Sequence, residues 1–297
     1  MNTNKNAGLQ TGARLLLNNP SPNYNIADQF RKAMQAAGIH YDGEIIPDGK
    51  LRRFHIDGHK RGTLNGAYVL HGDGCPSGWF QNYASGISQT WKLTGGQKAA
   101  YDPVKIAEVR QQREAERLQA HKKAAETAAY IWRSAKPATN HAYLTKKRIQ
   151  PHGARLYRDA LVIPIHNESD RLVNLQFITA DGTKRFLAGG RKRGCFFTIG
   201  DLTDTLLICE GFATGASLHE NTGQRVVIAF DAGNLLPVAR NIRELSPDSE
   251  IIVCGDNDIS GVGQAEAREA ALAVNGKILI PPKAGCDWND YISGGAA

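Results

Sequence analysis

The chain has 297 residues, of which 41% are hydrophobic and 22% charged, so its composition is that of a folded protein and its length favours two domains. No run approaches about 18 consecutive apolar residues, and the amino terminus lacks the apolar core of a signal peptide, so no membrane partner is expected. The five cysteines form no Cys-x-x-Cys pair, which favours reduced thiols in a cytoplasmic protein.

The formal net charge of +7 is unevenly distributed along the chain. Residues 1–200 contain 30 lysines and arginines against 15 acidic residues, whereas residues 201–297 contain 6 against 14. A basic body next to an acidic last third is compatible with binding of a polyanion, and equally with two independent domains of unlike surface.

The first hundred residues predict a helix over 26–37 and then a β-rich stretch over 44–93, which we assign together as an N-terminal DNA- or template-binding domain, residues 1–100. Short alternating runs such as GAYVLH and GWFQNY are separated by glycine-containing turns. Aromatic residues are interleaved with cations, a pattern that suits single-stranded DNA because bases stack on rings while cations follow phosphates. About half of these aromatic residues must form the core of so small a sheet. The candidate DNA-binding residues are Arg52, Arg53, Lys60, Arg61 and Trp79.

A histidine pattern in the same region has two interpretations. Four potential zinc ligands occur at a spacing that two neighbouring hairpins could bring together: His55, His59, His71 and Cys75. The surrounding glycines explain the segment equally as turns. Because the chain has no Cys-x-x-Cys, a standard zinc ribbon is excluded, and zinc is not expected here.

Residues 101–150 are expected to be a helical connector. The segment 103–135 is rich in alanine and carries Glu/Arg pairs at helical spacing, which predicts one long helix. Its charges are those of a solvated face rather than of a dedicated DNA contact.

The pattern of the sequence changes after residue 150. Strand-like runs and basic residues fill 151–203, predicting a small basic α+β subdomain. Residues 204–297 then alternate strictly between apolar strands and helical segments, which predicts a parallel sheet flanked by helices, an α/β fold.

Carboxylates fall where the strands of this sheet are predicted to end. Glu210 follows the strand LLIC, and Asp256 and Asp258 follow the strand IIVC. Ligands of open α/β sheets bind at the carboxyl ends of strands, so these side chains should converge and hold Mg²⁺ or Mn²⁺. Asp287 and Asp290 follow the next strand and extend the acidic rim. The alternative is that each carboxylate caps the following helix or turn.

The order of these blocks resembles a known family. An apolar strand followed by Glu-Gly, and later one followed by Asp-x-Asp-x-x-Gly, resembles the Toprim domain of bacterial primases, topoisomerases and some nucleases. The runs HAYLTKKRI, LQFITADGTKRFL, CEGFATGASL, AFDAGNL, CGDNDISGVGQAEA and CDWNDY resemble plasmid and phage primases of the TraC-like type. The likeness covers 127–292 well and 25–95 more loosely.

The resemblance implies roles for particular residues. Glu210 would be the catalytic glutamate, which could also bind metal, Asp256 and Asp258 the metal-binding pair, and Asp287 and Asp290 further acidic residues of the site. Nucleotide or template binding is implied for Lys184, Arg185, Arg191, Lys192 and Arg193. Asp231 and Asn234, in the run FDAGN, are added to that set, although Asp231 is equally explained as a helix cap. Thr214 stands where related primases often have an aspartate, which puts metal binding at that corner in question.

The implied activity is a DNA primase, a nucleotidyltransferase that makes short primers on single-stranded DNA from nucleoside triphosphates by two-metal phosphoryl transfer. Such an enzyme would serve plasmid or phage replication or conjugation and could meet a replicative helicase or a single-strand-binding protein. The alternatives are a Toprim nuclease and a non-catalytic module that binds single-stranded DNA or loads a helicase. The sequence does not decide whether the chain is part of a longer primase–helicase.

Overall fold

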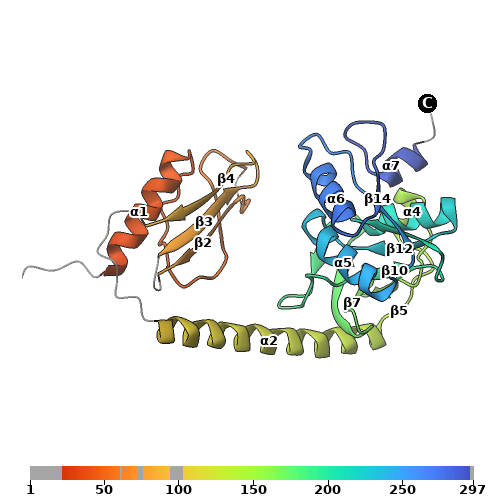
Figure 1. Ribbon diagram of the computed structural model, residues 1–297, viewed down its shortest axis with the longest axis horizontal. Helices are drawn as coiled ribbons and strands as arrows, with labels where there is room; N and C mark the ends of the chain where they lie inside the picture. Colours follow the sequence, from red (N-terminus) through yellow and green to blue (C-terminus); the bar gives the residue numbers. More distant parts are fainter. Residues whose placement is uncertain (1–21, 61, 73–75, 94–102, 295–297) are drawn as a thin grey trace, which may run out of the picture. The chain divides into compact units, whose positions relative to one another are not determined.

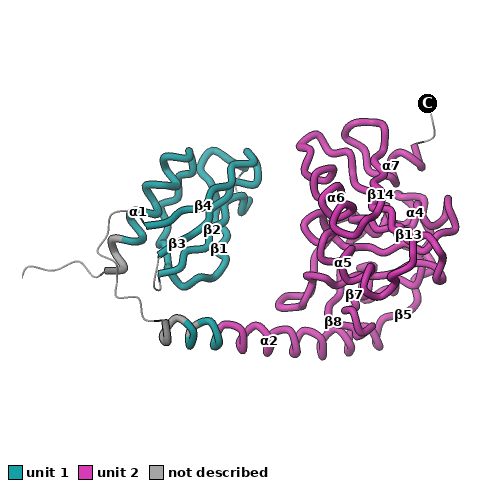
Figure 2. Tube along the Cα trace, in the orientation of Figure 1, with its two compact units in different colours: residues 1–112 teal, residues 113–297 magenta. Residues whose placement is uncertain are grey.

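The computed structural model describes residues 22–60, 62–72, 76–93 and 103–294. The chain divides into two compact units, residues 1–112 and 113–297 (Figure 2). The boundary falls inside the long helix α2 (Pro103–Ser134), which the sequence predicts almost to the residue. The finer division into four parts is not tested by this and stays a prediction. None of the helices in the described ranges is both long and apolar enough to cross a membrane.

In the described residues, unit 1 has a four-stranded antiparallel sheet with helix α1 (Pro22–Ala36) packed on it (Figure 1), and the first turns of α2 also belong to this unit. Helix α1 precedes strands β1 (Arg52–Phe54), β2 (Gly66–His71), β3 (Ser77–Asn82) and β4 (Ser88–Lys92), which pair in chain order. Successive strand residues point to opposite faces. The face under α1 carries Phe54, Tyr68, Phe80 and Trp91, and the Phe30 ring of α1 lies edge-on against the last three.

Unit 2 begins with a five-stranded antiparallel sheet. Its strands are β5 (Lys136–Pro137), β6 (Arg155–Tyr157), β7 (Ala160–His166), β8 (Leu172–Ile178) and β9 (Lys184–Phe186), with helix α3 (Ala142–Lys147) between the first two. On one face Val162 and Leu175 pack with Ala128 of α2. On the other, Leu161, Ile163 and Ile165 join the core of the next sheet, so the two sheets of unit 2 share a hydrophobic core.

The second sheet of unit 2 has the strand order β10-β12-β11-β13-β14. Strands β11 (Thr205–Cys209), β12 (Arg225–Ile228), β13 (Glu250–Cys254) and β14 (Lys277–Leu279) are parallel, as the sequence predicts. Strand β10 (Phe197–Ile199) adds an antiparallel edge. This edge was not predicted, because three residues carry too little periodicity to be told from a loop.

Helices cover both faces of this sheet. Helices α4 (Phe212–Thr222) and α7 (Trp288–Ser293) pack on the face that carries Leu207 and Cys209. Helices α5 (Leu235–Leu245) and α6 (Val262–Ala273) pack on the face that carries Leu206 and Ile208. The predicted α/β fold is confirmed, and because both faces are buried, polar groups of this sheet are left to the strand ends.

Candidate active site

Glu210, Asp256 and Asp258, here called the acidic corner, follow neighbouring strands. Cys209 of β11 is paired with Cys254 of β13, so the residues after them leave the sheet side by side. A Cβ atom added to Gly263 would lie 3.0 Å from Asp258 Oδ2 and 3.2 Å from Glu210 Oε1. Oxygens from both strand ends therefore face one small space, which the glycine of α6 leaves open.

The corner is electrostatically unfavourable when nothing is bound. Burial, reinforced by repulsion from Asp256, Asp258 and Asp231, raises the pKa of Glu210 to about 7. Burial, with repulsion from Asp287 and attraction by Lys184 acting against it, raises the pKa of Asp256 to about 6. One buried oxygen of each, Glu210 Oε1 and Asp256 Oδ1, has no hydrogen-bond partner among the described residues.

Asp258 is held differently from the other two carboxylates. Its oxygens accept hydrogen bonds from the Gly263 and Val262 backbone N–H groups, at 2.8 and 3.2 Å, and from the Ser260 hydroxyl at 2.8 Å. Partial burial opposes ionisation, but these hydrogen bonds outweigh it and lower the pKa of Asp258. The side chain thus caps the start of α6, as the alternative interpretation expected, and still turns one oxygen towards Glu210.

The donor set suits a hard divalent cation that is only partly held by protein. Across the described residues, no group of three or more histidine, cysteine, aspartate or glutamate side chains is placed so that it could hold a metal ion. Mg²⁺ is commonly bound by one or two carboxylates, with waters and substrate phosphates completing its shell. Two buried carboxylate oxygens without hydrogen-bond partners, beside an ionised aspartate, fit that mode of binding.

A lysine-lined pocket of about 240 Å³ lies beside the acidic corner. Its walls include Lys146, Lys147 and Lys184, together with Gly211 and Thr214 at the start of α4. The Lys184 ammonium is 3.7 Å from the position that a Gly211 Cβ would occupy. Although part of its side chain is exposed, burial lowers the pKa of Lys184, while Asp287 and Asp256 favour its charged form. We call this cavity, with the residues that line it, the lysine pocket.

The sequence predicts Lys184 but not Lys146 or Lys147. Both are the last residues of helix α3, in the run TKKR, far from Glu210 in the chain, and nothing in their spacing distinguishes them from solvated lysines. The buried Tyr143 and Leu144 of the same helix, and the hydrogen bond of 2.8 Å from the Asn289 amide to the Lys147 carbonyl oxygen, fix α3 in place.

Asp287 and Asp290 are engaged by groups other than a metal. Asp287 caps α7 by accepting a hydrogen bond of 2.7 Å from the Asp290 backbone N–H. Asp290 forms an ion pair of 2.7 Å with Lys147, and the other Asp287 oxygen is 3.8 Å from the same ammonium. The structure thus places both aspartates beside the lysine pocket. Asp287 acts as a helix cap, as the alternative interpretation expected, and Asp290 holds Lys147 in place.

The residues 191–195, here called the basic loop, lie against the end of β12. Lys192 forms an ion pair of 2.5 Å with Asp231, and Arg191 makes a two-pronged contact with Glu168 at 2.8 and 3.2 Å. Asp231 makes no capping hydrogen bond through its side chain. Asn234 is only 3% exposed, and its side-chain amide binds backbone groups of the basic loop and of the segment after β12.

The remaining predicted residues are dispersed. Arg185 and Arg193 are exposed on β9 and the basic loop, and Thr214 is buried at the start of α4. In unit 1, Arg52 pairs with Asp48 at 2.8 Å, the Arg53 guanidinium lies 4.1 Å from the centre of the Tyr83 ring, and Lys60 is exposed. Trp79 donates to the Ser88 hydroxyl at 2.9 Å. Arg61 lies outside the described residues.

The histidines weighed as zinc ligands contact their own turns. His55 Nδ1 lies 2.9 Å from the Thr63 carbonyl oxygen, and His59 Nδ1 lies 3.1 Å from the Asn65 amide. His71 pairs through its backbone with Asp48, and Cys75 lies outside the described residues. These contacts match the interpretation of the segment as turns.

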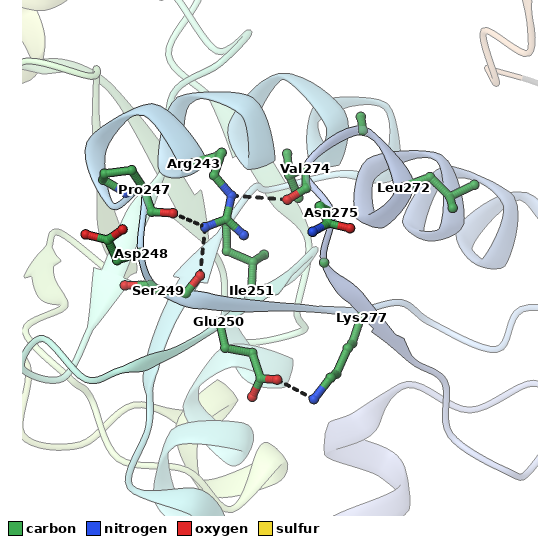
Figure 3. A pocket seen from close by; sticks show the side chains of 12 residues that line it. Arg243, Pro247, Asp248, Ser249, Glu250, Ile251, Leu272, Val274, Asn275 and Lys277 are labelled. Atoms are coloured by element: carbon green, nitrogen blue, oxygen red, sulfur yellow. Dashed lines mark hydrogen bonds and ion pairs between the residues drawn. The ribbon is translucent and has the colours of Figure 1, made fainter.

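A larger cavity, about 720 Å³, lies at the opposite end of β13 (Figure 3). Arg243 lines this cavity and donates hydrogen bonds to the carbonyl oxygens of Val274, Pro247 and Ser249. Glu250 and Lys277 form an ion pair at its edge. It has no cluster of unpartnered carboxylates. The chemistry therefore points to the carboxyl end of the sheet in spite of the smaller pocket there.

Comparison with known proteins agrees with this placement. Residues 205–297 match the family model of the Toprim domain. The chain is 34% identical over 287 residues to a DNA primase TraC of Escherichia coli, covering 88% of this chain and 27% of that protein. A second DNA primase TraC of Escherichia coli is 34% identical over 279 residues, covering 86% and 19%. The chain thus spans about a quarter or less of the length of these relatives.

A solved structure, the zinc-binding and RNA polymerase domains of the Aquifex aeolicus primase, aligns over 93% of this chain and 82% of that one. At 11% identity and a TM-score of 0.41, it assigns no residue of this site.

The parallel sheet with its acidic corner, in the residues that match the family model, is a Toprim domain. The identity to the two TraC primases extends well beyond that domain, so the chain is similar to TraC-like Toprim primases over most of its length.

Proposed function

We propose that this chain is a template-directed primase, which joins nucleotides into short primers on single-stranded DNA. The observation that carries the proposal is the acidic corner of Glu210, Asp256 and Asp258 directly beside the lysine pocket. Phosphoryl transfer needs a metal to neutralise developing charge and cations to hold phosphates, and these two groups of side chains supply the places for both. The likeness of the chain to the TraC primases is consistent with this activity.

Each side chain has a defined part in the proposed reaction. Asp256 and Asp258 would hold Mg²⁺ or Mn²⁺, which when bound stabilises negative charge on the transferring phosphoryl group. Glu210, whose pKa of about 7 lies near working pH, is suited either to share that metal or to take the proton of the attacking 3′-hydroxyl. Lys147 and Lys184 would hold nucleotide phosphates, and Asp290 keeps Lys147 directed into the pocket.

The open face of unit 1 is our candidate for template binding. The strands β1–β4 contain no acidic residue, and the face away from α1 carries Arg53, Val69 and Trp79. Tyr83 is 45% exposed and stacks with Arg53. Cations and accessible rings on one sheet face suit the backbone and bases of a single strand. Arg52 contributes less to this proposal, because Asp48 neutralises it.

The proposal also covers the setting. A plasmid, phage or conjugative role, and contact with a replicative helicase or a single-strand-binding protein, follow from the family rather than from any described surface. The relatives that match are named DNA primase, which supports nucleotidyl transfer over the nuclease alternative.

The test incubates the protein with single-stranded DNA, labelled nucleoside triphosphates and Mg²⁺ or Mn²⁺. Short labelled products that require both template and metal are expected. Degradation of the template would instead establish the nuclease, and binding without products would establish the non-catalytic module. Asp256→Asn should abolish the products while leaving the melting temperature at or above that of the parent.

A further inference from the structure

We propose that Asn234 is a positioning residue, which holds the basic loop on the end of β12 so that Lys192 is presented at the acidic corner to a nucleotide phosphate. The inference rests on the proposed function, because it takes a nucleotide to be the ligand of that corner. It changes the role that sequence suggested for Asn234, from contact with the ligand to control of a residue that makes the contact.

The side chain of Asn234 uses nearly its whole hydrogen-bonding capacity on the basic loop and its surroundings. Its Oδ1 accepts from the Gly194 N–H at 2.8 Å. Its Nδ2 donates to the carbonyl oxygens of Ala229, Cys195 and Lys192, at 2.8, 3.1 and 3.2 Å. Three of these four partners belong to the basic loop and one to the segment after β12. A buried amide satisfied in this way fixes the distance between the two segments.

The backbone on both sides of this contact is sharply turned. Gly194 has φ +71°, and Phe230, which precedes Asp231, has φ +74°. A bulky residue adopts the left-handed region only where the surroundings impose it, and such residues are concentrated at functional sites. The turn at Phe230 directs the chain from β12 into Asp231 and Asn234, which therefore leave the strand end together.

Lys192 is the cation that this arrangement delivers. Its ammonium contacts Asp231 at 2.5 Å and lies 5.1 Å from the centre of the Phe186 ring. Asp231 is near enough to Glu210 to be one of the charges that raise its pKa. With 38% of its side chain exposed, Lys192 can exchange a carboxylate oxygen for a phosphate oxygen without leaving its place. A phosphate that enters the corner meets a cation already aligned.

A second asparagine also holds the basic loop, and it allows the inference to be tested by a milder substitution. Asn241 of α5 donates to the Gly194 carbonyl oxygen at 2.8 Å, so the N–H and the carbonyl group of Gly194 are each held by an asparagine side chain. Asn241 is half-buried, whereas Asn234 is buried, so truncation of Asn241 should disturb folding less. Asn241→Ala should therefore loosen the loop even if a change at Asn234 prevents folding.

The experiment is a double-mutant cycle between Asn234 and Lys192. The readouts are the KM for ATP and kcat in primer synthesis, and ATP binding in the presence of Mn²⁺ measured by calorimetry. Asn234→Asp keeps the size and the acceptor of the side chain but replaces a donor to three carbonyls with an oxygen. We expect Lys192→Met and Asn234→Asp each to raise the KM for ATP roughly 10-fold, with kcat changed much less. The double variant should be no worse than Lys192→Met alone. Asn241→Ala should give a smaller increase that also vanishes in the Lys192→Met background.

Two controls separate positioning from loss of stability. Val238→Ala removes buried volume from α5 and should lower the melting temperature without raising the KM for ATP. Asn221→Ala removes an asparagine bond to a helix carbonyl and should change neither quantity.

An increase in KM from Asn234→Asp or Asn241→Ala that multiplies with that of Lys192→Met would overturn the inference, as would a parent-like KM in all three single variants. In either case the parent would still bind ATP and make primers, so the proposed function would stand. If the parent protein bound no ATP and made no primers, both this inference and the proposed function would be overturned.

Discussion

The sheet of unit 1 and the Toprim sheet keep their polar side chains in different places. The Toprim sheet buries Leu206 and Ile208 on one face and Leu207 and Cys209 on the other, so its functional groups stand at strand ends. The sheet of unit 1 buries one face under α1, and among the described residues its other face carries Arg53 and Trp79.

Because of this difference, the two regions should respond to substitution with unequal strength. A strand end gathers a few carboxylates into one small volume, where each acts on the same ligand and the loss of one disables the site. An open face makes many similar contacts along a strand of DNA, and each contributes only a part of the binding energy. We therefore expect effects of very different size from the two regions.

The largest effect is expected at the acidic corner. Asp256→Asn keeps the shape of the side chain but removes the charge that would hold metal, a loss of several kcal/mol of transition-state stabilisation, or about 10³-fold in rate. Primer synthesis under saturating template and nucleotide measures it. Asp248→Asn, at the opposite end of β13, is the matched control and should leave the rate unchanged. Equal activity of the two variants would refute the assignment of the site.

A smaller effect is expected from pH on metal binding. Metal competes with protons for Glu210 and Asp256, whose pKa values are about 7 and about 6. Mn²⁺ affinity should therefore rise between pH 5.5 and pH 8, by up to roughly 10-fold per unit for each proton displaced. Calorimetry in buffers of different ionisation enthalpy counts the protons released. Glu210→Gln should flatten the profile.

The stability of the metal-free protein should change with pH in the opposite direction to its metal affinity. Both carboxyl groups have a pKa that is raised on folding, from 4.5 for Glu210 and 3.8 for Asp256. Their protonation favours the folded state, so this contribution is complete below pH 4 and is lost as pH rises through about 6 to 7. Without metal the protein should melt at a lower temperature at pH 8 than at pH 6, and Mn²⁺ should reverse that loss. A Mn²⁺ affinity independent of pH would contradict the assignment of these groups to the metal.

The two regions also differ in what their sequence reveals. Strict alternation of strands and helices predicts the Toprim sheet, and the rule for strand ends places Glu210, Asp256 and Asp258 together without a structure. Lys147 is not predictable in this way, because tertiary packing of α3 against α7 brings it to the site. The backbone contacts of Asn234 are not predictable for a related reason, since the residue type does not show whether an amide faces a ligand or the backbone.

Lys147 gives the third prediction. Lys147→Ala removes a cation from the lysine pocket and also leaves Asp287 and Asp290 uncompensated, so the KM for nucleotide should rise roughly 10-fold while kcat changes less. Lys277→Ala, which removes a lysine–glutamate pair at the far end of the sheet, is the matched control. A lower kcat at unchanged KM would show that Lys147 acts on the transition state instead.

The smallest single effects are expected on the open face of unit 1, where two tryptophans allow a matched test. Trp79 faces away from α1 and Trp91 faces it, with the Trp91 and Phe30 ring centres 5.4 Å apart. Trp79→Ala should weaken binding of an oligothymidine about 10-fold or less, the size of one lost base stack, without destabilising the protein. Trp91→Ala should instead destabilise unit 1. If Trp79→Ala left the affinity unchanged at low and high salt, with Arg53→Ala equally silent, template would be bound elsewhere and this face would serve another purpose.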